Sequence, residues 1–263
     1  MLTAAGRRIR YDVRLGDPRQ TPLLLCCGIG AGFEVLQPVV DALDRTVIRF
    51  DVPGVGGSRA GLLPDGIPRL AWMVERMLKQ LGFDQVDVLG LSWGGALAQQ
   101  LAAQHRRRVR RLVLVSTGTG ALMVPGRPTT LLRMLTPRRF GDPEYAAGIA
   151  GAIYGGSARE HAGDIREVFQ NQVRAGSLRG YLYQLAAGAV WTSLPFLGLI
   201  RQPTLVLTGD DDPIIPVVNG RILARLIPHA ELHIYRGGHV ELVTEAPALV
   251  PVITRFLSAE GDA

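Results

Sequence analysis

Short apolar runs recur along the chain with helix-length segments between them. They cover residues Leu23 to Leu25, Val47 to Phe50, Val86 to Leu91, Leu112 to Val115, Thr204 to Leu207 and Leu232 to Tyr235. Continuous apolar runs of strand length are typical of parallel strands buried on both faces. The pattern predicts an α/β protein with a mostly parallel central sheet flanked by helices. The earlier stretch Ile9 to Val13 alternates apolar and polar residues, which predicts a hairpin at an antiparallel edge.

The strand-like runs stop between Ser116 and Gln202, an interval far longer than the usual connection of about 2–6 residues. We expect residues 120–195 to form a helical cap (lid) inserted between strands, over the carboxyl ends where open α/β sheets bind ligands. Residues 1–119 and 196–263 then form the core of one folding unit. Apolar spacing predicts cap helices at Thr130 to Leu135, Ala146 to Ile153 and Ile165 to Val173.

The composition is that of an ordinary globular enzyme, with 263 residues, 47% of them hydrophobic and 20% charged. The 29 basic and 23 acidic residues give a net charge of +6. Five arginines cluster where a helix should end before the next strand, which suits a helix C-terminus and a solvated face: Arg106, Arg107, Arg108, Arg110 and Arg111. Because aromatic interleaving and nucleic-acid motifs are missing, we expect no nucleic-acid partner. A loose attraction to an anionic particle or membrane surface stays open.

Two features of the sequence bear on the cellular compartment in which the protein works. The N-terminal MLTAAGRRIRYDV is not followed by an apolar stretch of signal-peptide length, and no run reaches the ~18 apolar residues of a membrane span. The two cysteines, Cys26 and Cys27, are adjacent, so they cannot close an ordinary disulfide loop. We therefore expect a cytoplasmic protein that is not transmembrane.

The hexapeptide GLSWGG at residues 90–95 sits at the end of the run Val86 to Leu91 and before a helical pattern, Ala96 to Ala103. It matches G-x-S-x-G, the nucleophile elbow, in its required strand-to-helix setting. Side chains at the flanking positions of such a turn would collide with the neighbouring strand and helix, so glycine clears the space. The pattern predicts Ser92 as a catalytic nucleophile.

A serine hydroxyl needs a base to take its proton and an acid to orient that base. Thr208-Gly209-Asp210-Asp211-Asp212-Pro213 follows one predicted strand, and Gly237-Gly238-His239 follows the next. We assign Asp212 as the acid, since it is the third residue after Gly209 and precedes PIIP, and His239 as the base. Asp210 and Asp211 are expected to make turn hydrogen bonds.

Other readings of these residues have less support. A metal site at the three aspartates lacks a histidine at ligand spacing, so we expect no metal. The remaining histidines lie at a helix end, in the cap, or beside or in a strand, and each is expected to be structural: His105, His161, His229 and His233. The turn from Asp51 to Ser58 is also assigned a structural role.

The oxyanion of an acyl-transfer intermediate needs two aimed hydrogen-bond donors. The Trp93 N–H follows the nucleophile and supplies one. We assign the second to the Ile29 N–H in the glycine-rich loop Cys27 to Gly32, after the first strand of the sheet. Neither G-x-x-x-x-G-K-[ST] nor G-x-G-x-x-G is present there, which excludes a nucleotide-binding interpretation.

With these residues placed, the chain resembles the α/β-hydrolase superfamily and, more closely, the intracellular depolymerases of medium-chain polyhydroxyalkanoates (PHA). The likeness runs from about Arg10 to Leu257. Its stretches are GIGA at 28–31, FDVPGVGGS at 50–58, LSWGGALAQQ at 91–100, MVPG at 123–126, PRR at 137–139, IYGG at 153–156 and QPTLVLTGDDDPIIP at 202–216. The resemblance implies the Ser92, Asp212 and His239 triad, and a polyester of 3-hydroxy fatty acids, stored as granules, as substrate.

One residue departs from that resemblance. Related hydrolases often carry histidine or asparagine just before the glycine of the oxyanion loop, whereas this chain has Cys27, a much weaker hydrogen-bonding group. The support of the loop is therefore expected to differ.

The resulting hypothesis is a serine ester hydrolase (PHA depolymerase) that needs no cofactor. Apolar cap residues are expected to form a channel for alkyl side chains, namely Leu122, Met123, Trp191, Leu194, Phe196 and Leu197, although cap-to-core packing explains any one of them equally well. The alternatives are a small-molecule carboxylesterase or a carbon–carbon bond hydrolase with the same triad, and a non-catalytic binding protein on this fold. The intact triad argues against the last.

Overall fold

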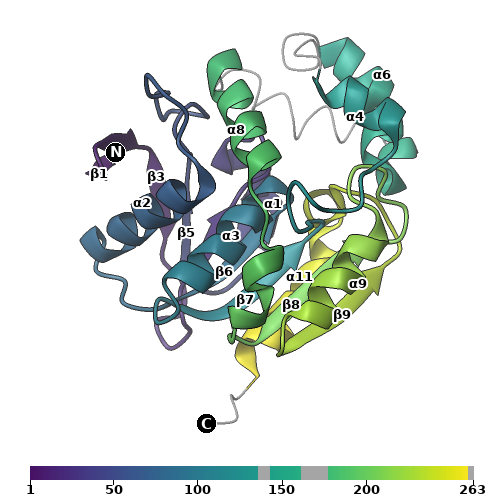
Figure 1. The fold of residues 1–263 in the computed structure, drawn as a ribbon. Helices are drawn as coiled ribbons and strands as arrows, with labels where there is room; N and C mark the ends of the chain where they lie inside the picture. Colours follow the sequence, from purple (N-terminus) through teal and green to yellow (C-terminus); the bar gives the residue numbers. More distant parts are fainter. Residues whose placement is uncertain (136–142, 161–176, 260–263) are drawn as a thin grey trace.

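The computed structural model of the chain describes residues 1–135, 143–160 and 177–259. Within these ranges one seven-stranded sheet forms the centre of the molecule, with its strands in the order β3-β5-β4-β6-β7-β8-β9 (Figure 1). Its members are β3 (Tyr11–Arg14), β4 (Leu23–Cys26), β5 (Val47–Phe50), β6 (Val86–Leu91), β7 (Val109–Val115), β8 (Thr204–Gly209) and β9 (Ala230–Tyr235). Edge strand β3 pairs antiparallel with β5, and the other pairs are parallel. The predicted α/β class is confirmed.

The six apolar runs all form strands of this sheet, with several strand ends shifted by one to three residues. Two differences from the prediction are the largest. Strand β7 begins at Val109, three residues earlier than expected. The stretch Ile9 to Val13 is split at Arg10: Ile9 ends β2 (Arg7–Ile9), which makes a separate hairpin with β1 (Leu2–Ala4), and Tyr11 begins β3. The antiparallel edge is therefore present, but the hairpin is not part of the large sheet.

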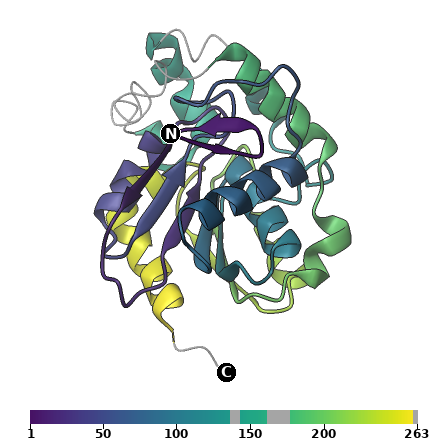
Figure 2. The same ribbon diagram turned by 90° about the vertical axis from the view of Figure 1, so that its left-hand side faces the viewer.

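Helices cover both faces of the sheet (Figure 2). One face packs against α2 (Ile67–Gln80), α3 (Trp93–Gln104) and α9 (Val217–Leu226), and the other against η1 (Phe33–Leu36), α1 (Gln37–Asp41), α10 (Glu241–Thr244) and α11 (Ala246–Ser258). Neighbouring residues of β4 alternate between the two cores, since Leu24 packs in the first and Leu25 in the second. Burial on both faces explains why the strands read as continuous apolar runs. In the part of the chain that the structure describes, no helix is both long and apolar enough to cross a membrane.

The long interval between β7 and β8 contains α4 (Pro128–Leu135), α6 (Pro143–Tyr154), η2 (Gly156–Arg159), α8 (Leu178–Val190) and η3 (Leu194–Leu199). Figures 1 and 2 show α4, α6 and α8 at one end of the sheet. Helices α4 and α6 match predicted ones, α8 was not predicted, and Ile165 to Val173 lies outside the described residues. Backbone bonds close the base of the inserted segment, from Ala121 N to Trp191 O (2.7 Å) and from Ser193 N to Thr119 O (3.0 Å).

The arginine cluster lies differently from the expectation. Only part of it follows helix α3, because Arg110 and Arg111 belong to strand β7. The Arg110 guanidinium pairs with Asp87 of β6 at 2.6 Å, and Arg45 pairs with the same carboxylate at 2.8 Å. The side chains of Asp87 and Arg45 are 0% and 2% exposed, so this ion pair lies inside the protein. Two of the five arginines therefore lie in a strand instead of capping a helix; Arg110 pairs within the sheet, and the Arg111 guanidinium donates to Ala259 O at 2.7 Å.

Candidate active site

Ser92 lies between β6 and α3 in a strained backbone conformation, with φ +55° and ψ −120°. Its N–H donates to Val115 O (2.9 Å), and its carbonyl accepts from Thr117 Oγ1 (2.8 Å). A Cβ at Gly94 would collide with the backbone of Cys26, and one at Gly95 with Thr117. The glycines are needed for close packing, as the sequence predicted, and the turn holds Ser92 in a conformation that non-glycine residues adopt only when the surroundings enforce it.

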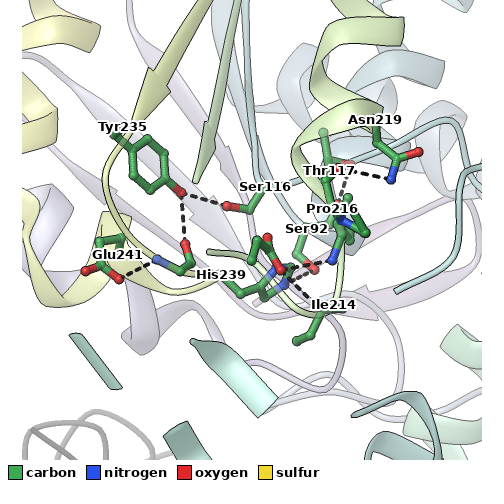
Figure 3. Close-up of polar contacts among 12 residues, drawn as sticks. Ser92, Ser116, Thr117, Ile214, Pro216, Asn219, Tyr235, His239 and Glu241 are labelled. Atoms are coloured by element: carbon green, nitrogen blue, oxygen red, sulfur yellow. Dashed lines mark hydrogen bonds and ion pairs between the residues drawn. The ribbon is translucent and has the colours of Figure 1, made fainter. Parts of the chain in front are cut away.

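His239 connects Ser92 to Asp212, and Figure 3 shows His239 beside Ser92. Its Nε2 lies 2.8 Å from Ser92 Oγ, and its Nδ1 lies 2.7 Å from Asp212 Oδ2. The N–H groups of Ile214 and Ile215 donate to the other Asp212 oxygen, both at 2.9 Å. All three side chains come from loops at the carboxyl ends of β6, β8 and β9, and all three residues are buried. The structure brings together the three residues that the sequence singled out.

The acid loop after β8 and the histidine loop after β9 are joined by hydrogen bonds. Asp210 Oδ1 accepts from Gly237 N (3.0 Å), so it bonds across loops instead of within a turn. The Tyr235 hydroxyl contacts Ser116 Oγ at 2.8 Å and donates to Gly238 O at 3.2 Å (Figure 3). Burial raises the pKa of the Tyr235 phenol, which keeps this donor protonated. These bonds fix the position of His239.

The third aspartate, Asp211, also has a structural partner. It pairs with Arg159 of η2 at 2.8 Å and accepts from Gly156 N at 2.9 Å, which lowers the pKa of its carboxyl. Each carboxylate of the aspartate run is therefore engaged in the fold. Over the described ranges, no group of three or more His, Cys, Asp and Glu side chains is arranged to hold a metal.

The glycine-rich loop after β4 passes beside Ser92. Residues Gly28 to Ala31 form a turn closed by a bond from Ala31 N to Gly28 O (3.2 Å), and the φ of +70° at Gly30 is typical of the third position of a type II turn. A Cβ at Gly28 would lie 3.6 Å from Ser92 Cβ. In the described chain, no group accepts a hydrogen bond from the Ile29 N–H. The Trp93 N–H opens helix α3, where the first amides have no partner within the helix.

Ile29 and Trp93 meet Ser92 at the wall of an apolar cavity of about 380 Å³. Helix α8 supplies Gln184, Leu185 and Gly188 to this wall. Ser92 and His239 also line a smaller apolar cavity of about 60 Å³. Ser92, Ile29, Met134 and Ile214 line both cavities, so the Ser92 hydroxyl lies where two apolar spaces meet.

Of the six residues predicted to form the substrate channel, two line the larger cavity, Met123 and Trp191. The structure does not bring Leu122 there: it lies inside a turn closed by Met123 N and Gly120 O, and its side chain is 65% exposed. Phe196 packs edge-on against the far side of Trp191, with ring centroids 6.0 Å apart. Leu194 and Leu197 pack with the core on the same side.

The sequence interpretation missed some wall residues because they are small or polar, among them Ala96, Gln184 and Gly188. It also missed large apolar ones, such as Leu185 and Ile214. A signal was present for Gln184, since it is a single amide among apolar residues in the stretch YLYQLAAGAV.

The residues expected to be structural have structural positions. Asp51 accepts from Phe33 N (3.0 Å) and Gly57 N (2.8 Å), and so holds its own turn against the loop after β4. His105 ends α3, and His229 and His233 precede or lie in β9, none of them at either cavity. His161 lies outside the described residues.

Comparison with known proteins shows what this arrangement is similar to. A family model described as the alpha/beta hydrolase fold matches residues 21–246. A poly(3-hydroxyalkanoate) depolymerase from Ectopseudomonas oleovorans is 49% identical over 97% of this chain and 90% of its own length. A 3-oxoadipate enol-lactonase from Acinetobacter baylyi is 27% identical over 94% of this chain and 92% of its own. The crystal structure of a hydrolase from Pseudomonas aeruginosa has a TM-score of 0.82 at 26% identity, covering 98% of this chain and 97% of that one.

Proposed function

The chain belongs to the α/β-hydrolase fold family, and on that premise we propose that it is a serine hydrolase that cleaves the ester bonds of poly(3-hydroxyalkanoates). The observation that carries the proposal is the continuous hydrogen-bonded arrangement of Ser92, His239 and Asp212 beside a cavity with almost entirely apolar walls. The relative with 49% identity, a poly(3-hydroxyalkanoate) depolymerase, supports the substrate class.

The proposed reaction proceeds through an acyl-enzyme. His239 Nε2 takes the proton of Ser92 Oγ as that oxygen attacks the ester carbonyl carbon. The N–H groups of Ile29 and Trp93 donate to the oxyanion of the tetrahedral intermediate. When the intermediate collapses, His239 protonates the leaving alcohol. A water molecule, deprotonated by His239, then attacks the acyl group and releases the acid and free Ser92.

In this proposal, residues 120–195 are a cap that shapes the binding site, and residues 1–119 and 196–263 carry the triad. Support comes from α8, which contributes four residues to the wall of the cavity at Ser92: Gln184, Leu185, Gly188 and Ala189. The cavity of about 380 Å³ is within the size range of small-ligand sites and has room for an alkyl side chain of a 3-hydroxyacyl unit. Met123 and Trp191 would contact that side chain.

The proposal extends to location: the enzyme acts in the cytoplasm on polymer stored as granules. Both cysteines are free, and Cys26 is buried, which is in keeping with a reducing compartment. The polymer itself is the expected partner.

A soluble small ester is the second candidate substrate. It is favoured by the 27% identity to an enol-lactonase, which spans most of both chains. Activity on aryl esters does not separate the two candidates, because both kinds of enzyme cleave them. Hydrolysis of the polymer does separate the two candidates.

The experiment is release of 3-hydroxy acids from emulsified medium-chain PHA, with Ser92→Ala run beside the wild type and a fluorophosphonate probe used to label Ser92. Release by the wild type alone supports the depolymerase. Labelling without release shifts the function to a small-molecule hydrolase. If the probe leaves Ser92 unlabelled, the proposal is wrong and a non-catalytic role is favoured.

A further inference from the structure

Gln184 of helix α8 contacts both halves of the proposed oxyanion hole. Its Oε1 accepts a hydrogen bond from Gly30 N at 2.6 Å, in the turn that contains Ile29. Its main-chain carbonyl accepts from the indole Nε1 of Trp93 at 3.0 Å. The residue is 4% exposed and lies at the cavity wall beside Ser92. One buried residue of the cap therefore bonds to the two segments that carry the oxyanion donors.

The bond to Gly30 holds a part of the loop that is otherwise free to rotate. In a type II turn a flip of the central peptide, here between Ile29 and Gly30, changes the ψ of Ile29 and the φ of Gly30 and so reshapes the loop that carries the Ile29 N–H. A flip would turn the Ile29 carbonyl oxygen toward Gln184 Oε1, and two acceptors facing each other repel. The Gln184 amide therefore favours the orientation of the turn seen here.

The loop lacks an equivalent support from its own sequence. Cys27 precedes Gly28, and a thiol is a weak hydrogen-bonding group. Burial raises the pKa of the Cys27 thiol well above its usual range, so the residue stays neutral and does not offer a thiolate acceptor. A strong buried acceptor reaches the loop instead from a helix 154 positions away in the chain.

We propose that Gln184 is a positioning residue for the oxyanion hole, holding the Ile29 turn and the Trp93 side chain in the arrangement that binds the tetrahedral intermediate. The inference rests on the proposed serine hydrolase function. Removing a direct oxyanion donor lowers the turnover rate by about 10²–10³-fold. Loss of a residue that only positions such a donor should cost less, about 10–100-fold in kcat.

The test compares Gln184→Met with the wild type, because methionine keeps the length of the side chain and removes the strong acceptor. With a p-nitrophenyl ester, kcat should fall about 10–100-fold, while KM changes less than about threefold. Affinity for a trifluoromethyl ketone, which forms an oxyanion when Ser92 adds to it, should fall with kcat. Affinity for the matching methyl ketone, which stays a neutral carbonyl, should be unchanged.

The matched control is Tyr183→Phe, which removes a hydrogen bond from the same helix to Leu62 O, away from the oxyanion loop. It should leave both kcat and the ketone affinities at wild-type values. A Gln184→Met enzyme with wild-type kcat and trifluoromethyl ketone affinity would overturn the inference. Equal weakening of both ketones would also overturn it, because the role would then be substrate binding alone.

Failure of the proposed function has a different signature. If ester hydrolysis by the wild type were absent, or were unchanged in Ser92→Ala, the serine mechanism itself would be wrong. Hydrolysis that requires Ser92 but does not respond to Gln184→Met rejects only the role of Gln184. A thermal unfolding curve for each variant separates loss of folding from both.

Discussion

His239 Nδ1 lies 2.7 Å from one oxygen of Asp212, while the other oxygen accepts two backbone N–H groups. The two backbone bonds fix the orientation of the carboxylate. An ionised carboxylate can only accept hydrogen bonds, so Nδ1 must carry the proton of the imidazole. Nε2 is then free to accept the proton of Ser92, so the tautomer that the proposed mechanism needs follows from how Asp212 is held.

Asp212→Asn should therefore lower kcat by about 10³–10⁴-fold, because an amide that donates toward Nδ1 favours the wrong tautomer. The neighbouring variant Asp210→Asn is the control. Its amide oxygen still accepts from Gly237 N, so kcat should change less than about threefold. The measurement is steady-state hydrolysis of a p-nitrophenyl ester, and equal losses in the two variants would show that only loop stability matters.

Gly188→Leu should shorten the alkyl chain that the enzyme accepts. Gly188 lines the larger cavity, and a Cβ added there makes ordinary contact with the Trp93 ring, so a leucine side chain would occupy cavity space. An octanoyl ester loses the burial of about four methylene groups, at about 0.8 kcal/mol each, or about 200-fold in kcat/KM. A butanoyl ester should lose less than about fivefold.

The control for this change is Gly148→Leu in α6, where nothing lies within 4 Å of the added Cβ. It should keep the wild-type ratio of octanoyl to butanoyl activity. An unchanged ratio in Gly188→Leu would mean that the acyl chain binds elsewhere, for example toward the smaller cavity.

Asp87→Asn should destabilise the fold by about 3–5 kcal/mol, because it leaves the buried Arg45 guanidinium without its counter-ion. Asp84→Asn is the matched control: this exposed carboxylate pairs with Arg108 at 3.2 Å, and its loss should cost less than about 1 kcal/mol. Urea unfolding of each variant gives the free energies. Equal values for the two would indicate that Arg45 finds other partners.

His105 should make the protein less stable as the pH falls below 6.5. Burial lowers the pKa of its imidazole, and within the described chain its buried Nε2 has no hydrogen-bond partner. The unfolded chain takes up this proton near pH 6.5, whereas the folded chain does so only at a lower pH. The contribution of His105 to the free energy of unfolding is therefore complete above pH 6.5, and it is lost as the pH falls from the unfolded pKa to the lower folded pKa.

The measurement is the melting temperature at pH 7.5 and pH 5.5. His105→Gln should lose less on acidification than the wild type, because it cannot take up a proton. Identical losses would assign the acid sensitivity to other groups.

The strands of the sheet and the turn that holds Ser92 were predictable because each is marked by residues adjacent in the sequence. Apolar runs mark strands buried on both faces, and the glycines around Ser92 mark a turn too tight for side chains. The start of β7 was not predictable, because Arg110 and Arg111 interrupt its apolar pattern. Arg110 fits in a strand through its pairing with Asp87, 23 positions away, and periodicity does not show such a partner.

Helix α8 and its contacts were not predicted, for a related reason. Large apolar side chains indicated Trp191 and Met123, which line the cavity, whereas the wall also includes the backbone of Gly188 and the amide of Gln184. The importance of Gln184 comes from the hydrogen bond that its Oε1 accepts from Gly30 N. These residues are 154 positions apart, so the contact exists only in the folded chain.

Two hydrogen bonds described above bear on how such an enzyme evolves: one joins Thr119 to Ser193, and the other joins Ala121 to Trp191. The inserted segment leaves and rejoins the core at neighbouring points, so its length and sequence can vary without shifting the register of β7 against β8. The entropy of closing a longer loop grows only logarithmically. On the proposed function, selection can therefore replace the half of the binding site that would contact the acyl chain while Ser92, Asp212 and His239 keep their places.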